Sequence, residues 1–148
     1  MVFVLGIIAV LAMMTLPLYI ERNVQQQVKE GVAFAEFMQR GVSAAYLLTG
    51  ALPKDNAAAG LPAPGKIIGN YIVSGTVSEG VITLVFGNLS VSNIRGKRIT
   101  LRPGYVPDAP QVPLSWICAF GKSPGGLTIA GSNATDIPQQ WLPAACRG

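Results

Sequence analysis

The residue types that usually carry catalysis are scarce in this sequence. Its 148 residues include seven carboxylates, eleven cations and two cysteines, but no histidine, which is the commonest general base and metal ligand. Two carboxylates, Glu30 and Glu36, lie close in sequence, but on a helix they would occupy different faces. The other acidic residues weighed as metal ligands are Asp55, Glu79, Asp108 and Asp136. None has the spacing of a metal-binding loop, so we expect no enzyme activity, catalytic residue, metal, cofactor or small-molecule substrate.

The two cysteines can perform one reaction, the formation of a disulfide. Cys118 and Cys146 both lie near the C-terminus and are too few and too far apart for a thiolate zinc site. A disulfide between them would stabilise the fold by roughly 3–4 kcal/mol in the chain-entropy model. It would also indicate a periplasmic or extracellular location. The alternative is a pair of free, buried cysteines.

The densest cluster of positive charge consists of Arg95, Lys97, Arg98 and Arg102. Such a cluster could bind DNA, because affinity grows with each phosphate that a cation neutralises. Cations on an edge strand and its turn are also a common protection against edge-to-edge pairing of sheets. Both interpretations stay open at this point.

The first twenty residues, MVFVLGIIAVLAMMTLPLYI, contain no charge. At ~1.5 Å per residue, a helix of this length spans ~30 Å, the hydrocarbon thickness of a bilayer. A basic start and a small-residue cleavage site, which mark a signal peptide, are missing, so we expect the segment to be retained. Gly6 and Pro17 are its weak points. Proline removes a backbone hydrogen bond and clashes with the preceding turn, so we expect a kink or a looser helix there.

The helical pattern continues beyond Glu21 without a stop signal. An apolar stripe at helical spacing comprises Ile20, Val24, Val28, Val32, Phe34, Phe37, Met38, Val42, Ala45 and Tyr46. The opposite face is largely polar, with Gln25, Gln26, Lys29, Glu36, Gln39 and Arg40. Gly50 and Pro53 predict that the helix ends near Leu48. We therefore expect two parts: a hydrophobic helix over residues 1–20, and a head over residues 21–148 that includes the amphipathic half of the helix.

The rest of the chain predicts an α+β fold, a long helix packed on about four antiparallel strands. Residues 49–66 are rich in Ala, Gly and Pro and indicate a loop. Strands are expected, from β-branched content and turn signals, at Tyr71–Val77, Val81–Phe86, Ile99–Arg102 and Pro113–Ala119. Phe120–Ala145 is expected to be a loop with little regular structure, fixed by the disulfide. Trp116 and Trp141 are expected to anchor the core or this loop.

Three motifs together resemble one family. They are the helix MTLPLYIERNVQQQVKEGV, the strand pattern NYIVSGTVSEGVITLVFGN followed by GKRITLRP, and SWIC followed by IPQQWLPAACRG. In this order they resemble the bacterial type IVa pilins over nearly the whole chain. Pilins usually begin with a methylated phenylalanine and carry a glutamate shortly after it, whereas this sequence starts with Met1 and has Leu5. Aligning Pro17 with the family proline places about five further residues before Met1.

The resemblance implies a structural subunit that polymerises through its N-terminal helix into an extracellular type IV pilus. It implies that the helix packs in the filament core and loosens between Gly6 and Pro17. The loop closed by Cys118 and Cys146 would then shape subunit contacts on the surface. Expected partners are identical subunits, the inner membrane before assembly and the pilus assembly machinery, with DNA or a host surface as further candidates. The filament would serve adhesion, twitching motility and DNA uptake. The alternatives are a minor pilin or pseudopilin that primes or caps a filament, and a membrane-anchored module that binds DNA or another ligand.

Overall fold

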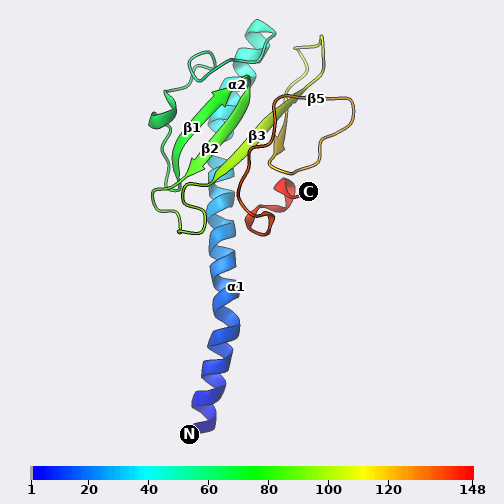
Figure 1. The fold of residues 1–148 in the computed structure, drawn as a ribbon. Helices are drawn as coiled ribbons and strands as arrows, with labels where there is room; N and C mark the ends of the chain where they lie inside the picture. Colours follow the sequence, from blue (N-terminus) through cyan, green and yellow to red (C-terminus); the bar gives the residue numbers. More distant parts are fainter. Residues whose placement is uncertain (1) are drawn as a thin grey trace.

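The computed structural model describes residues 2–148, apart from the side chains of residues 15–18. A long helix runs the length of the molecule, and a sheet with its loops lies against the half that is remote from the N-terminus (Figure 1). We call this half of the molecule the head. Its proximal end faces the bare part of the helix, and its distal end surrounds the C-terminus of the helix. The architecture confirms the predicted α+β fold, with one helix packed on an antiparallel sheet.

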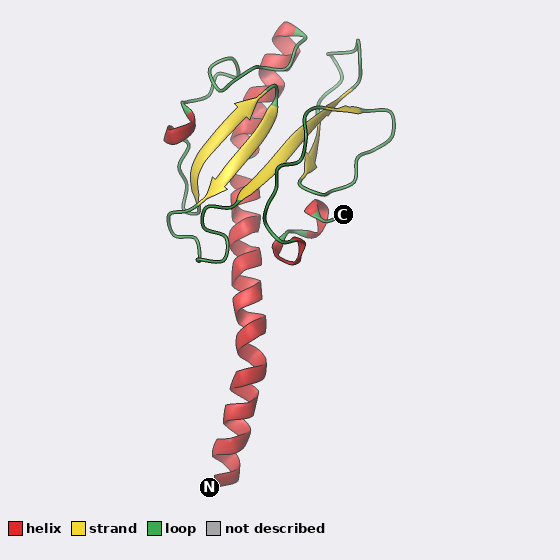
Figure 2. Ribbon diagram, in the orientation of Figure 1, coloured by secondary structure: helices red, strands yellow, loops and turns green. Residues whose placement is uncertain are grey.

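The long helix consists of α1 (Val2–Phe34) and α2 (Glu36–Thr49). They meet at Ala35, whose N–H donates to the carbonyls of Val32 at 3.1 Å and Gly31 at 3.3 Å. The helical ladder resumes at once, because Gln39 N–H donates to the Ala35 carbonyl at 3.0 Å. In Figure 2 the two elements form one column. Gly50 ends it in a left-handed conformation, with φ of 73°, which glycine adopts without strain. The predicted end of the helix is thereby confirmed.

The sheet contains β1 (Ile72–Ser78), β2 (Val81–Phe86), β3 (Arg98–Tyr105), β4 (Ser115–Cys118) and β5 (Thr128–Ile129). The first four pair antiparallel in chain order, and β5 pairs with β3. The four predicted strands are therefore present, but the segment 120–145 is less irregular than predicted, because it contains β5 and the 3₁₀ turn η2 (Gln139–Trp141). A strand of two residues carries no periodic signal, so the sequence pattern could not indicate it.

The core lies between the helix and the inner face of the sheet. The helix contributes Val24, Val28, Met38 and Val42, all fully buried. The sheet supplies a matching apolar set, Ile72, Ile82, Leu84, Phe86, Ile99 and Leu101. Ile20, predicted to begin the buried stripe, is 51% exposed. This part of the prediction is wrong because Ile20 borders an open hollow with Glu21, Gln140 and Trp141, and the packed face begins one turn later at Val24.

Loop residues cover the outer edge of β1 and the part of β3 that does not pair with β4. On β1, the Asn56 side chain donates to the Gly75 carbonyl at 3.0 Å and accepts from Val77 N–H at 2.7 Å. On β3, residues 134–136 continue along the edge that β4 leaves free. Thr135 Oγ1 accepts from Thr100 N–H at 3.0 Å there. Strand β3 thus lies in the interior of the sheet, between β2 and β4. The interpretation of its cations as protection of an edge strand is therefore wrong.

Candidate assembly surface

Most of the exposed large hydrophobic residues that the structure describes lie on the lower half of α1. Twelve large hydrophobic residues between 2 and 20 are each more than half exposed: Val2, Phe3, Val4, Leu5, Ile7, Ile8, Val10, Leu11, Met13, Met14, Tyr19 and Ile20. We call this set the bare segment. By length and composition alone the helix could cross a membrane, and its most apolar stretch is not buried by the rest of the chain. Monomeric soluble proteins rarely expose contiguous apolar patches of this extent. The bare segment is therefore suited to contact lipid or other protein chains.

Gly6 lies within this segment and makes a notch in its surface. A Cβ added at Gly6 would meet no atom within 4 Å. The residues that line the notch are Val2, Phe3, Ile7, Val10 and Leu11. The backbone is assigned as helix through both Gly6 and Pro17, while the Pro17 side chain lies outside the described part. Loosening of the helix between these two residues stays a prediction.

The opposite end of the chain is fixed to the head by a disulfide between Cys118 and Cys146, whose Cα atoms are 4.7 Å apart. The bond joins the end of β4 to the 3₁₀ turn η3 (Ala144–Cys146). A backbone hydrogen bond supports it, since Phe120 N–H donates to the Cys146 carbonyl at 3.0 Å. Cys146 is buried, and the nearby Trp116 and Trp141 pack partly buried against the core. The predicted disulfide-closed loop is therefore confirmed.

The four predicted DNA-binding cations do not form one uniform strip. Arg95 and Lys97 lie in the loop from β2 to β3, where Arg95 donates to the Ser90 carbonyl at 2.9 Å. Arg98 begins β3 and makes an ion pair of 3.8 Å with Asp136. Arg102 is half-buried further along the same strand, and its Nε has no hydrogen-bond partner. The first three are thus grouped at the start of β3, and Arg102 is set apart from them.

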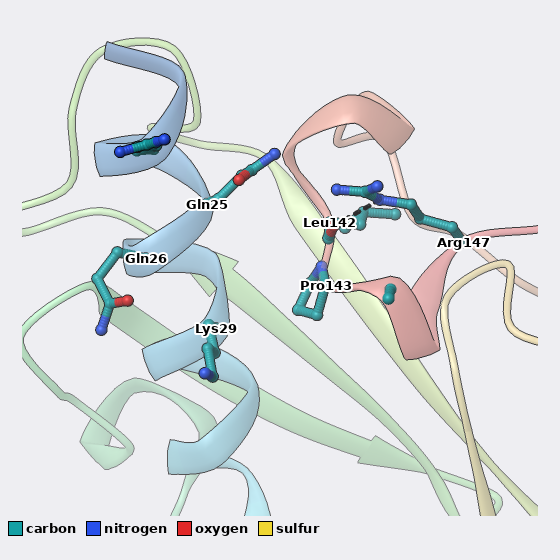
Figure 3. Close-up of a pocket in the computed structure, with 8 residues that line it drawn as sticks. Gln25, Gln26, Lys29, Leu142, Pro143 and Arg147 are labelled. Carbon is teal, nitrogen blue, oxygen red and sulfur yellow. Dashed lines mark hydrogen bonds between the residues drawn. The ribbon is translucent and has the colours of Figure 1, made fainter. Parts of the chain in front are cut away.

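A second group of cations lies in a cleft that the sequence analysis did not identify. The cleft, of about 540 Å³, separates α1 from the C-terminal segment and is lined by Arg22, Gln25, Gln26, Lys29, Leu142, Pro143, Ala144 and Arg147. We call it the proximal cleft. In Figure 3 Gln25 extends from the helix toward the C-terminal segment, and Arg147 lies on the far side. Gln25 donates to the Gln140 carbonyl at 2.7 Å, and Arg147 Nε donates to the Leu142 carbonyl at 2.8 Å. No lining residue is acidic.

The sequence offered one clue to this cleft, the seven-residue spacing of Arg22 and Lys29, which places both on one face of a helix. The approach of Arg147 could not be inferred because it depends on the path of the C-terminal segment. Within the part of the chain that the structure describes, no group of three or more acidic or cysteine residues could hold a metal ion.

Comparison with known proteins places the chain among bacterial filament subunits. A family model described as pilin, a bacterial filament protein, matches residues 25–147. A fimbrial protein of Neisseria meningitidis serogroup A is 33% identical over 156 residues, covering 99% of this chain and 89% of the relative. The type IV major pilin protein PilE1 of Neisseria gonorrhoeae is 29% identical over 153 residues, covering 99% and 83%. Fimbrial protein EcpC of Eikenella corrodens is 31% identical over 150 residues, covering 99% and 86%.

Proposed function

This chain belongs to the pilin family of bacterial filament proteins, and from that premise we propose that it polymerises through residues 1–20 into a type IV pilus outside the cell. A pilin is a structural subunit of a filament of identical copies and not an enzyme. In the proposed assembly, residues 1–20 form the filament core and residues 21–148 form the outward-facing head. The observation that carries this division is that each large apolar side chain of the bare segment is more than half exposed, below a well-packed head.

Burial of the bare segment against other copies would make the filament more stable than a subunit dissolved in water. Fully burying a Val, Leu, Ile or Phe side chain contributes about 1.5–3 kcal/mol relative to exposure. Association must offset a loss of translational and rotational freedom of about 4–15 kcal/mol. Twelve exposed side chains are therefore enough to keep a subunit in the filament rather than in water, whereas transfer from lipid would depend on close packing between helices. The notch at Gly6 would let a neighbouring helix approach closely, and loosening between Gly6 and Pro17 would let the segment adjust to its neighbours.

Before assembly, the bare segment is proposed to lie in the inner membrane. Its length matches the ~30 Å hydrocarbon core, and a helix satisfies its backbone hydrogen bonds internally, as spanning segments must, except for the one that Pro17 removes. The pilus assembly machinery would then transfer each subunit from lipid to the growing filament. Because the apolar surface is in contact with either lipid or protein at every stage, it would not be exposed to water.

Adhesion, twitching motility and DNA uptake are proposed as activities of the assembled filament, through contacts with a host surface or DNA. For DNA, the relevant cations are Arg95, Lys97 and Arg98, since Arg102 is set apart from them and its Nε is buried. Neutralising these three to Gln should leave filaments intact and weaken DNA binding by sheared filaments, because each lost phosphate contact lowers affinity. Salt-titrated DNA binding measures this, and unchanged affinity would exclude the cluster as the DNA site.

Electron microscopy of sheared surface material, from cells with and without this gene, tests the proposed function. Thin filaments that vanish in the deletion and consist mainly of this chain would establish it as the filament's main subunit. The intact mass of the subunit in the same sample would reveal its mature N-terminus. Filaments that persist in the deletion, or contain only traces of the chain, would instead indicate a minor pilin that primes or caps them.

A membrane-anchored module that binds DNA or another ligand without polymerising is the second candidate function, favoured by the exposed cations Arg95 and Arg98. It predicts saturable, salt-sensitive binding by a chain that stays in the membrane fraction. The same shearing experiment separates the two, since this module would be absent from sheared material.

A further inference from the structure

The proximal cleft is lined by three cations, and none of its lining residues is acidic. Arg22 and Lys29 project from α1, and Arg147 lies across from them in the C-terminal segment. Arg147 is held in place by its hydrogen bond to the Leu142 carbonyl. In the part of the chain whose side chains are described, a single ion pair is formed, between Arg98 and Asp136. The cations of the cleft are therefore available to an acidic group from outside the chain.

The distal end of the head carries exposed carboxylates, which outnumber the one exposed cation beside them, Lys54. Glu79 forms the turn between β1 and β2, which is joined to the segment after α2 by hydrogen bonds from Glu79 N–H to the Lys54 carbonyl and from Gly80 N–H to the Pro53 carbonyl. Asp55 follows directly in that segment and is exposed.

Asp108 is a third exposed carboxylate at this end of the head, from another part of the chain. It lies in the loop from β3 to β4, whose residues 110–114 line a groove with the last turn of α2. Figure 1 shows the turn between β1 and β2 and the loop between β3 and β4 at the end of the head farthest from the N-terminus. Asp55, Glu79 and Asp108 are all exposed. We call these three residues the distal acidic group.

We propose that the distal acidic group of one copy docks in the proximal cleft of the next copy along the filament, an inference that rests on the proposed polymerisation. Such a contact joins different surfaces of two identical chains, and it generates an open helical assembly when each copy is also displaced along the axis, so that no ring closes. From Arg22 to Thr49 the helix rises ~40 Å at ~1.5 Å per residue. Two parallel copies displaced by that length bring the two ends together while their helices remain side by side.

The anionic surface of a bilayer is the other partner that could attract these cations. Headgroups add about 5–8 Å on each side of a ~30 Å hydrocarbon core. Lys29 lies ~13 Å above Ile20, where the apolar segment ends, at ~1.5 Å per residue. Lys29 therefore lies beyond the headgroup layer, whereas Arg22, ~3 Å above Ile20, lies within it. The positive charge of the proximal cleft is matched by the distal acidic group on the same protein. This match favours a second copy of the chain over the bilayer as the partner of the cleft.

Charge reversal at the two ends tests this contact. The double variant Arg22→Glu/Lys29→Glu removes cations that make no hydrogen bond or ion pair that the fold requires, and Glu79→Lys/Asp108→Lys reverses the distal end. We expect each double variant to lower the yield of sheared filaments at least about tenfold, because like charges would then face each other. The quadruple variant, in which both ends are reversed, should recover most of the yield. Lys66→Glu and Glu36→Lys make matched changes at exposed positions between the two ends and should assemble normally.

The readouts distinguish the contact from other causes of failure. Intact disulfide by mass and unchanged thermal unfolding would verify that each variant folds. Normal assembly by Arg22→Glu/Lys29→Glu would overturn the proposal, and so would a folded quadruple variant that assembles no better than the doubles. If the cleft variant instead loses binding to vesicles of anionic phospholipid and the quadruple does not recover assembly, the cleft faces the membrane and the proposal is wrong. Absence of filaments from the unaltered chain would contradict the proposed function itself.

Discussion

The two halves of one helix have opposite surroundings in this molecule. Above residue 23, Val24, Val28, Met38 and Val42 are fully buried against the sheet. Below it, every described large apolar side chain is at least half exposed. The upper half is stable because its own chain supplies the packing partner, as is usual for amphipathic helices in proteins. The lower half must obtain its partner from lipid or from other copies. The difference separates folding of the head from assembly of the filament, and substitutions in the two halves should affect different measurements.

The largest effect on folding is expected for Val28→Asp in the upper half. Val28 is fully buried among apolar side chains, and an uncompensated buried charge costs roughly 3–5 kcal/mol, a large part of the stability of a typical domain. The head should unfold tens of degrees lower or fail to accumulate. Thermal unfolding followed by circular dichroism measures this, with Val28→Ile as the control of similar shape. A head of normal stability would show that the helix and sheet do not form one core.

The corresponding substitution in the lower half of the helix is Val10→Asp. Val10 is 57% exposed and contributes nothing to the head, so the unfolding temperature of the head should not change. Filaments should be lost, because a charge in an apolar helix is expensive at the centre of a membrane, about 2.5–3.5 kcal/mol on insertion scales, and also in a packed core. Val10→Leu is the control. Normal filament yield from Val10→Asp would mean that this segment is not packed in the filament.

Removing the disulfide should have an intermediate effect confined to the head. Cys118→Ser together with Cys146→Ser opens a loop with a sequence separation of 28, which lowers stability by about 3–4 kcal/mol in the chain-entropy model. We expect a lower unfolding temperature and fewer surface filaments, while the variant still reaches the membrane. Urea unfolding and quantitation of sheared filaments provide the two readouts. Full stability and full filament yield would show that the C-terminal segment stays docked without the bond.

The smallest expected effect is the difference in head stability between alanine substitutions at two glycines of the same helix, Gly31 and Gly6. A Cβ at Gly31 would lie 2.6 Å from Phe86 Cε1 in the core, whereas one at Gly6 would meet nothing within 4 Å. Overpacking costs about 1–3 kcal/mol, and it outweighs the gain of up to ~1 kcal/mol in helix propensity. Gly31→Ala should therefore destabilise the head measurably, and Gly6→Ala should leave it unchanged. Equal unfolding temperatures for the two variants would contradict the close approach of helix and sheet at Gly31.

Much of this fold could be predicted from the sequence because its main signals are local. Helix periodicity and Gly50 determine the helix and its end, and the observed β2 has the predicted bounds, Val81–Phe86. The pairing of the cysteines followed from their number. What could not be predicted depends on contacts between remote segments. Strand β5 exists only because residues 128–129 meet Gly104 and Tyr105.

The same reason explains why the functional surfaces were predicted only in part. The bare segment is evident from composition alone. The proximal cleft joins Arg22 and Lys29 to a residue more than a hundred positions away, and no local pattern indicates that approach. The position of β3 in the sheet likewise depends on β4 and residues 134–136, so the environment of Arg98 and Arg102 could not be inferred from their spacing.

The central claim is that the bare segment gains its packing partner from other copies of this chain. A cryo-electron microscopy reconstruction of sheared filaments, in a strain where this chain is the main subunit, tests it most directly. The account predicts that residues 2–20 of many copies pack together along the filament axis, with the heads and the Cys118–Cys146 loop on the outside. A filament in which residues 2–20 face solvent, or in which the heads alone hold the copies together, would contradict it.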